Sequence, residues 1–191
     1  MSVAATERII NVPNALTSAR FVLAVVVFVL IEYALYPAAL AVFLVAASTD
    51  WVDGYWARRF GQVSKVGRIL DPFVDKIIIC GTFIYLASES PLSGIAPWVA
   101  VVVVGRELLV TALRSAIEAS GGDFSASWPA KWKMFFQCAA AAASLSTLAY
   151  GGSSQPKLLA YGLTASVWLT VITTVYSGLD YVVAAGRRWR S

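Results

Sequence analysis

The chain has 191 residues, of which 59% are hydrophobic and 14% charged, and it carries a formal net charge of +4 with no histidine. The mean hydropathy is +0.71, and this apolar content is well above that of a soluble domain, so a water-soluble fold is not expected. The absence of histidine removes the commonest general base and a favoured zinc ligand.

Long apolar stretches predict an all-α integral membrane protein that forms a single domain over residues 1–191. A helix needs about 20 mainly apolar residues to cross the hydrocarbon core of a bilayer. Residues 1–16 are expected to be a short polar or interfacial lead. Six transmembrane helices are predicted near 17–37, 38–59, 71–90, 94–118, 131–150 and 157–184.

Lysine and arginine gather before the first span, between spans two and three, around the connection of spans four and five, and at the C-terminus. Because such residues favour the cytoplasmic side, both termini are predicted to be cytoplasmic. The basic excess is therefore a topology signal, and nucleic acid is not needed to explain it. The terminal RRWR segment is also suited to anionic lipid headgroups.

Four aspartates lie close together in TDWVDGYWARRFGQVSKVGRILDPFVDK, residues 49–76. Asp50 and Asp53 are three apart and would share one helix face; Asp71 and Asp75 are four apart and would share a face of the next helix. Asp71 followed by Pro72 is typical of a helix start. A short turn between the two helices would bring all four carboxylates together at the cytoplasmic end.

Four unpaired carboxylates at this depth would repel one another, so a compensating charge is expected. One interpretation is a salt-bridge cluster with Arg58, Arg68 and Lys76. The other is a site for two divalent cations, because an all-oxygen ligand set suits Mg²⁺ or Mn²⁺. Two such ions are the usual device for displacement at phosphorus. A cation transporter with intramembrane carboxylates is the alternative of a different class.

The spacing Asp-x2-Asp-Gly-x2-Ala-Arg-x8-Gly-x3-Asp-x3-Asp, from Asp50 to Asp75, resembles the signature of the CDP-alcohol phosphotransferases. The resemblance implies six transmembrane helices, a homodimer, and transfer of a substituted phosphate from a CDP-linked donor to an alcohol with release of CMP. It implies that the two metals are held by Asp50, Asp53, Asp71 and Asp75. It implies that Asp75 is also the general base. The implied CDP-binding residues are Asp50, Gly54, Ala57, Arg58, Gly67 and Asp71.

Three further stretches bear on the acceptor alcohol: NVPNALTSAR (11–20), GRELLVTALR (105–114) and SWPAKWKMFFQ (127–137). A cationic cluster beside a two-metal site indicates an acceptor that is itself a phosphate ester; plain topology charge with snorkelling side chains is the alternative. The candidate acceptor-phosphate ligands are Arg106, Arg114, Lys131 and Lys133. Other candidates in these stretches are Asn14, Thr17, Arg20, Glu107 and Gln137.

These stretches are similar to those of bacterial family members that use glycerol 3-phosphate. Ala130 and Met134 depart from that pattern, which usually has Gly and Thr there. The resemblance implies a bacterial inner-membrane enzyme, its active site facing the cytoplasm, that transfers the phosphatidyl group of CDP-diacylglycerol to sn-glycerol 3-phosphate. Inositol phosphate, or phosphatidylglycerol as in cardiolipin synthesis, are the alternative acceptors.

Overall fold

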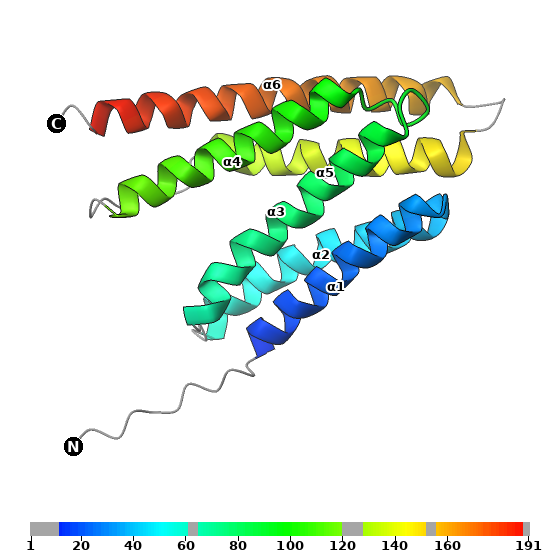
Figure 1. Ribbon diagram of the computed structural model, residues 1–191. Coiled ribbons are helices and arrows are strands. Elements are labelled where there is room, and N and C mark those ends of the chain that lie inside the picture. Colours follow the sequence, from blue (N-terminus) through cyan, green and yellow to red (C-terminus); the bar gives the residue numbers. More distant parts are fainter. Residues whose placement is uncertain (1–11, 61–64, 120–127, 152–155, 189–191) are drawn as a thin grey trace, which may run out of the picture. The chain divides into compact units, whose positions relative to one another are not determined.

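The computed structural model describes residues 12–60, 65–119, 128–151 and 156–188, and within these ranges the side chains of 17–49, 73–118, 132–151 and 156–187. Six α-helices account for nearly all of them, and no strand occurs in the described ranges, as the sequence predicted. The helices are α1 Val12–Glu32, α2 Tyr36–Phe60, α3 Lys65–Ser88, α4 Pro97–Ala119, α5 Trp128–Tyr150 and α6 Lys157–Arg188 (Figure 1).

The turn between α1 and α2 lies earlier than the sequence suggested, because the first predicted span ran to residue 37. The Leu35 N–H donates to the Leu30 carbonyl (2.8 Å) and the Ala34 N–H to the Ile31 carbonyl (2.9 Å). This is a Schellman motif, and Ala34 takes its left-handed position with a φ of 54°. Pro37 therefore belongs to the first turn of α2, where the missing N–H has no intrahelical partner to lose.

The predicted helix start at Asp71 and Pro72 is wrong, because α3 begins at Lys65 and both residues lie inside it. A proline within a helix removes the hydrogen bond to the carbonyl four residues earlier, here that of Arg68. Because Arg68 lies in the first turn of α3, the lost bond falls near the helix end. α1 begins at Val12, so it includes the last residues of the predicted lead over residues 1–16. The interfacial character of that lead stays a prediction.

The helices fall into two compact units, residues 1–81 and 82–191, and each is described by itself. In the first unit α1 and α2 run antiparallel (Figure 1). Both helices bury residues at helical spacing, three or four apart. Their buried apolar residues are Ala24, Val27, Ile31, Ala39, Phe43 and Ala46. The ring of Phe28 in α1 lies directly against Gly81 in α3.

In the second unit α6 contacts both α4 and α5. It runs antiparallel to α5 and in the same direction as α4 (Figure 1). The rings of Trp98 and Trp168 meet between α4 and α6, with centroids 6.0 Å apart. The segment before α4 is tied to α5 by Ser144, whose hydroxyl donates to the Ser93 carbonyl at 2.6 Å. The C-terminal ends of α4 and α6 thus lie near the start of α5.

Among the described helices, α6 is the one that is long and apolar enough to cross a membrane, over residues 157–187 with a mean hydropathy of 1.6. A shorter apolar stretch covers Tyr36–Thr49. Large apolar side chains are exposed on several helices. They include Val22, Val25 and Val29 on α1, Val101 and Leu108 on α4, and Leu158, Ile172 and Leu179 on α6. Six membrane crossings remain a prediction.

Candidate active site

The aspartate region occupies the end of α2 and the first half of α3. Asp50 and Asp53 lie on α2, and Asp71 and Asp75 on α3. Both pairs therefore have the helical spacing on which the prediction of a shared face rested. The side chains of three of these aspartates, and those of Ala57 and Arg58, lie outside the described residues, as do the surroundings of Gly54 and Gly67. The meeting of the four carboxylates remains a prediction.

Asp75 accepts a charge-assisted hydrogen bond from Nη1 of Arg20, an ion pair between α3 and α1. The Arg20 side chain is 4% exposed, whereas that of Asp75 is 31% exposed. Thr17, one turn earlier on α1, is buried as well. Two of the N-terminal candidates thus point into the protein, while the Asn14 side chain lies outside the described residues. The carboxylate of Asp75 is held from one side and accessible from another.

The aspartate region fits divalent cations by the chemistry of its donors. All four side chains are carboxylates, which are ligands that Mg²⁺ and Mn²⁺ prefer. Asp75 keeps part of its carboxylate exposed beside Arg20. Within the side chains that the structure describes, no three potential ligands gather into a metal site. Three of the four predicted ligands are not among those side chains.

A second cluster of charges joins α4 to α5. Glu107 accepts from Nη1 of Arg106 at 3.2 Å and from Nζ of Lys133, both through the same carboxylate oxygen. All three residues are more than nine-tenths buried. Two of the predicted acceptor-site cations are thus brought together, and Glu107 holds both. Lys131 lies on α5 with its side chain outside the described residues.

α6 supplies further contacts to the arginines of α4. Nη2 of Arg106 donates to the hydroxyl of Ser177 at 2.5 Å. The Arg106 guanidinium carbon lies 5.5 Å from the ring centroid of Tyr181, a cation–π geometry. The Tyr181 hydroxyl accepts from Nη2 of Arg114 at 3.3 Å. Three of the four predicted acceptor-site cations therefore belong to one described network.

Among the side chains that the structure describes, this network has unused donors and more positive than negative charges. Nε of Arg106 and Nε of Arg114 are buried and have no hydrogen-bond partner among the described residues. A buried polar group without a partner costs about 1–3 kcal/mol, and more when it is charged. Counted over these four described residues alone, three cations and the carboxylate of Glu107 give a formal charge of +2. An anion with several oxygens would satisfy both features at once.

Sequence reasoning missed the contribution of α6. The buried polar residues Thr170, Thr174, Ser177 and Tyr181 follow one another at intervals of four, three and four. That interval places them on one face of a helix. Nε2 of Gln137, a predicted candidate, lies 3.4 Å from the Thr174 hydroxyl, and its Oε1 has no partner within the described part of the chain. This polar stripe in an otherwise apolar helix was the available signal.

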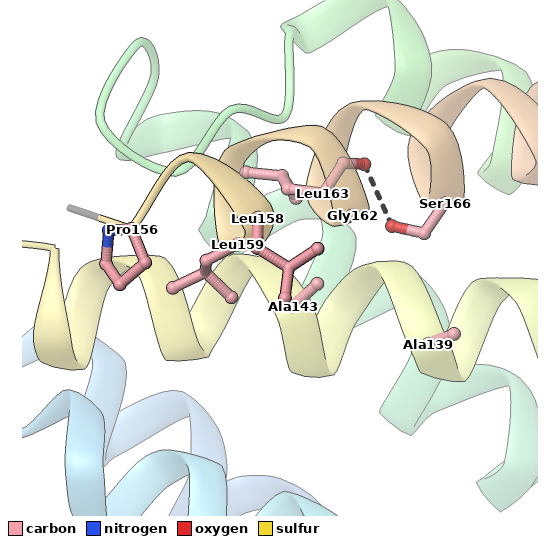
Figure 2. A pocket seen from close by; sticks show the side chains of 8 residues that line it. All are labelled: Ala139, Ala143, Pro156, Leu158, Leu159, Gly162, Leu163 and Ser166. Carbon is pink, nitrogen blue, oxygen red and sulfur yellow. Dashed lines mark hydrogen bonds between the residues drawn. The ribbon is translucent and has the colours of Figure 1, made fainter.

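A separate pocket of about 420 Å³ opens between α5 and the start of α6, beside Pro156 (Figure 2). It is lined by Ala139, Ala143, Pro156, Leu158, Leu159, Gly162, Leu163 and Ser166. No lining residue is ionisable, so the pocket suits hydrocarbon and not a phosphate. It is distinct from the charged network, whose α6 residues lie at least eleven positions further along.

The sequence profile of the CDP-alcohol phosphatidyltransferases matches residues 10–176. A Bacillus subtilis protein named CDP-diacylglycerol–glycerol-3-phosphate 3-phosphatidyltransferase is 31% identical, over 90% of this chain and 93% of its own. A Mycobacterium tuberculosis protein named probable phosphatidylglycerophosphate synthase is 36% identical, over 97% of this chain and 86% of its own length. An Escherichia coli protein has the same name as the B. subtilis protein, and it is 32% identical over 92% of this chain and 94% of its own length. This chain therefore belongs to the CDP-alcohol phosphatidyltransferase family.

Proposed function

We propose that the protein transfers the phosphatidyl group of CDP-diacylglycerol to sn-glycerol 3-phosphate, producing phosphatidylglycerophosphate and CMP. The buried network of Arg106, Glu107, Arg114 and Lys133 carries this proposal, because its surplus charge and unpartnered donors suit a phosphorylated acceptor. The relatives whose names specify glycerol 3-phosphate as acceptor support the same choice.

The aspartate region is the proposed catalytic centre. Asp75 takes the proton of the acceptor hydroxyl as that oxygen forms a bond to the phosphorus of the phosphatidyl group. The bond from this phosphorus to the bridging oxygen of CMP breaks, and CMP leaves with the electron pair. Divalent cations held by Asp50, Asp53, Asp71 and Asp75 would stabilise the charge on the departing CMP. Arg20 keeps the Asp75 carboxylate in place through their ion pair.

Donor recognition is proposed for the residues of the family signature. Gly54, Ala57 and Gly67 have small side chains or none, so a nucleotide can approach the backbone of α2 and α3 closely. Arg58 would meet the phosphates of the donor, since a guanidinium binds phosphate oxygens in pairs. Asp50 and Asp71 would contribute to the same site through the metal ions.

Acceptor recognition is proposed for the network in the second unit. A phosphate monoester carries a charge of about −1.5 to −2 at neutral pH. The formal charge of +2 on Arg106, Arg114, Lys133 and Glu107 nearly balances it. Arg106 and Arg114 each retain an unused Nε–H for its oxygens. Lys131 is proposed as an additional cation of this site.

The membrane setting follows from the exposed surface. Bulky apolar side chains are exposed along α1, α4 and α6, as expected of helices that face lipid. We propose one catalytic domain with six membrane-spanning helices in the bacterial inner membrane, with both termini and the active site on the cytoplasmic side. A homodimer is proposed by family resemblance.

The deciding experiment is a transfer assay on the purified protein in detergent micelles with radiolabelled CDP-diacylglycerol and Mg²⁺ or Mn²⁺. sn-Glycerol 3-phosphate, inositol phosphate, serine and phosphatidylglycerol are compared as acceptors. We expect CMP release and a labelled lipid phosphate with glycerol 3-phosphate, and loss of both when the metal is chelated. Turnover with another acceptor alone would overturn the assignment. Cation flux in proteoliposomes without CMP release would favour a transporter instead.

A further inference from the structure

Tyr181 touches both arginines of the acceptor network from a single side chain. Its ring lies against the guanidinium of Arg106, and its hydroxyl accepts from Arg114. Arg106 and Arg114 are eight residues apart on α4, about 12 Å along the helix axis at 1.5 Å per residue. Tyr181 is 3% exposed, so its position is fixed by packing. One buried phenol thus restrains two cations from α4.

The chemical nature of this contact matters because Tyr181 is neutral. Two guanidinium groups held near each other repel, and a carboxylate between them would cancel one positive charge. An aromatic face and a phenolic oxygen attract cations while leaving the formal charge unchanged. Tyr181 therefore restrains Arg106 and Arg114 without reducing the +2 surplus that an anion requires.

Other residues of α6 also contact the side chain of Arg106. Ser177 accepts from its Nη2 at 2.5 Å. A Cβ atom added to Gly178 would lie 3.3 Å from Cγ of Arg106, so the arginine stem runs closely past the helix there. Hydroxyl, bare backbone and ring follow one another within five residues of α6. Together these contacts restrain the Arg106 side chain from its stem to its guanidinium group.

We propose that Tyr181 is a positioning residue that holds Arg106 and Arg114 for the phosphate of the acceptor and thereby determines the KM for that acceptor. This inference rests on the proposed function, because it assigns α6 a part in the same acceptor site. Tyr181 touches neither donor nor reacting atoms in this scheme. Its loss weakens acceptor binding and leaves the chemical step intact.

The test compares Tyr181→Phe and Tyr181→Leu with the matched control Tyr176→Leu, which alters a tyrosine of α6 that is 63% exposed. Tyr181→Phe keeps the ring and loses the hydrogen bond to Arg114, so the KM for glycerol 3-phosphate rises about five-fold. Tyr181→Leu loses both contacts, and the KM rises about 30-fold. In all three variants kcat and the KM for CDP-diacylglycerol stay within about two-fold of the wild type.

An unchanged acceptor KM in Tyr181→Leu would overturn the inference. A lower kcat together with higher KM values for both substrates would also overturn it, because a purely structural role produces that pattern. Should Tyr181→Leu fail to fold, Tyr181→Phe decides the question by the same readout, because it removes the hydrogen bond from Arg114 and keeps the ring. The proposed function is tested separately by the wild-type protein. If it used another phosphorylated acceptor and Tyr181→Leu raised that KM, the acceptor assignment would fail and the positioning role would stand.

Discussion

Each of the two units buries an arginine, and the two arginines are stabilised differently. In the first unit Arg20 donates to Asp75, a carboxylate that is itself a proposed metal ligand and base. In the second unit Arg106 shares the carboxylate of Glu107 with Lys133 and meets neutral groups, Ser177 and Tyr181. The first arrangement holds the Asp75 carboxylate in place. The second restrains Arg106 while the cluster keeps a net positive charge.

Under the proposed mechanism, the two clusters divide the work of the transfer reaction in a protein without histidine. The proposed general base, Asp75, needs a defined position, and its ion pair with Arg20 supplies one. An anion site needs a net positive charge. Here one carboxylate, Glu107, serves two cations, and the neutral groups of Ser177 and Tyr181 restrain Arg106 without adding negative charge. The contrast therefore predicts different kinetic signatures for substitutions in the two units.

The largest effect is expected from Asp75→Asn. Without the base, we expect CMP release in the transfer assay to fall by about 10³-fold or more, because general base catalysis contributes about 10²–10⁴-fold. The matched control is Asp180→Asn, an exposed aspartate of α6 outside the proposed site. Full activity of Asp75→Asn in a protein that melts like the wild type would contradict the role of the first unit.

Glu107→Gln tests the second unit through its stability. The substitution leaves Arg106 and Lys133 buried without their shared carboxylate, and removing one member of a buried pair costs about 3–5 kcal/mol. Thermal unfolding in micelles should show a clearly lower midpoint than Glu118→Gln, which changes an exposed glutamate of the same helix. Equal midpoints for the two variants would show that Glu107 is not the anchor of the network.

The sequence supported the interpretation of the first unit by local spacing, whereas the contacts of the second unit depend on packing between distant helices. Asp50, Asp53, Asp71 and Asp75 lie on consecutive helices at fixed spacing, so local periodicity was enough to predict the faces they share. Their role came from the family resemblance and stays a prediction. The partner of Asp75 was not predictable in this way, because Arg20 is 55 residues away and only the packing of α1 against α3 brings it near.

The acceptor network shows the same limit more strongly. Arg106, Arg114 and Lys133 were candidates by type, whereas Ser177 and Tyr181 lie 71 and 67 positions from their partners. Such contacts depend on how α6 packs against α4. The six helices themselves followed from hydropathy, but the start of α3 did not, because Pro72 inside a helix looks like a helix start.

Arg20→Met and Arg106→Met compare the two buried arginines directly. We expect Arg20→Met to lower kcat about ten-fold with little change in the acceptor KM, as loss of an orienting partner does. Arg106→Met should raise the KM for glycerol 3-phosphate about 30-fold, since hydrogen bonds to charged groups contribute about 1.5–3 kcal/mol. Steady-state kinetics with each substrate varied separates these patterns. Identical patterns for both variants would contradict the division between the units.

The smallest effects are expected at two turns with left-handed backbone, where the first unit uses Ala34 (φ 54°) and the second Gly94 (φ 69°). Ala34→Gly should raise the free energy of unfolding by up to about 1 kcal/mol, because the left-handed region disfavours a Cβ by about 1–2 kcal/mol and glycine loses more entropy on folding. Gly94→Ala should lower it, since the new Cβ would also lie 2.6 Å from the Leu163 side chain. Denaturation in micelles measures both, and a stabilising Gly94→Ala would contradict this reading.

Binding of the acceptor phosphate by Arg106 and Arg114, as proposed, would also link the lifetime of the protein to its metabolic surroundings. A ligand that binds only the folded state stabilises it by about 2.7 kcal/mol at 100 times its dissociation constant. A cell rich in phosphorylated acceptor would thus protect this protein from unfolding and proteolysis, and a starved cell would clear it sooner. The supply of substrate would then regulate how much enzyme persists as well as how fast it works.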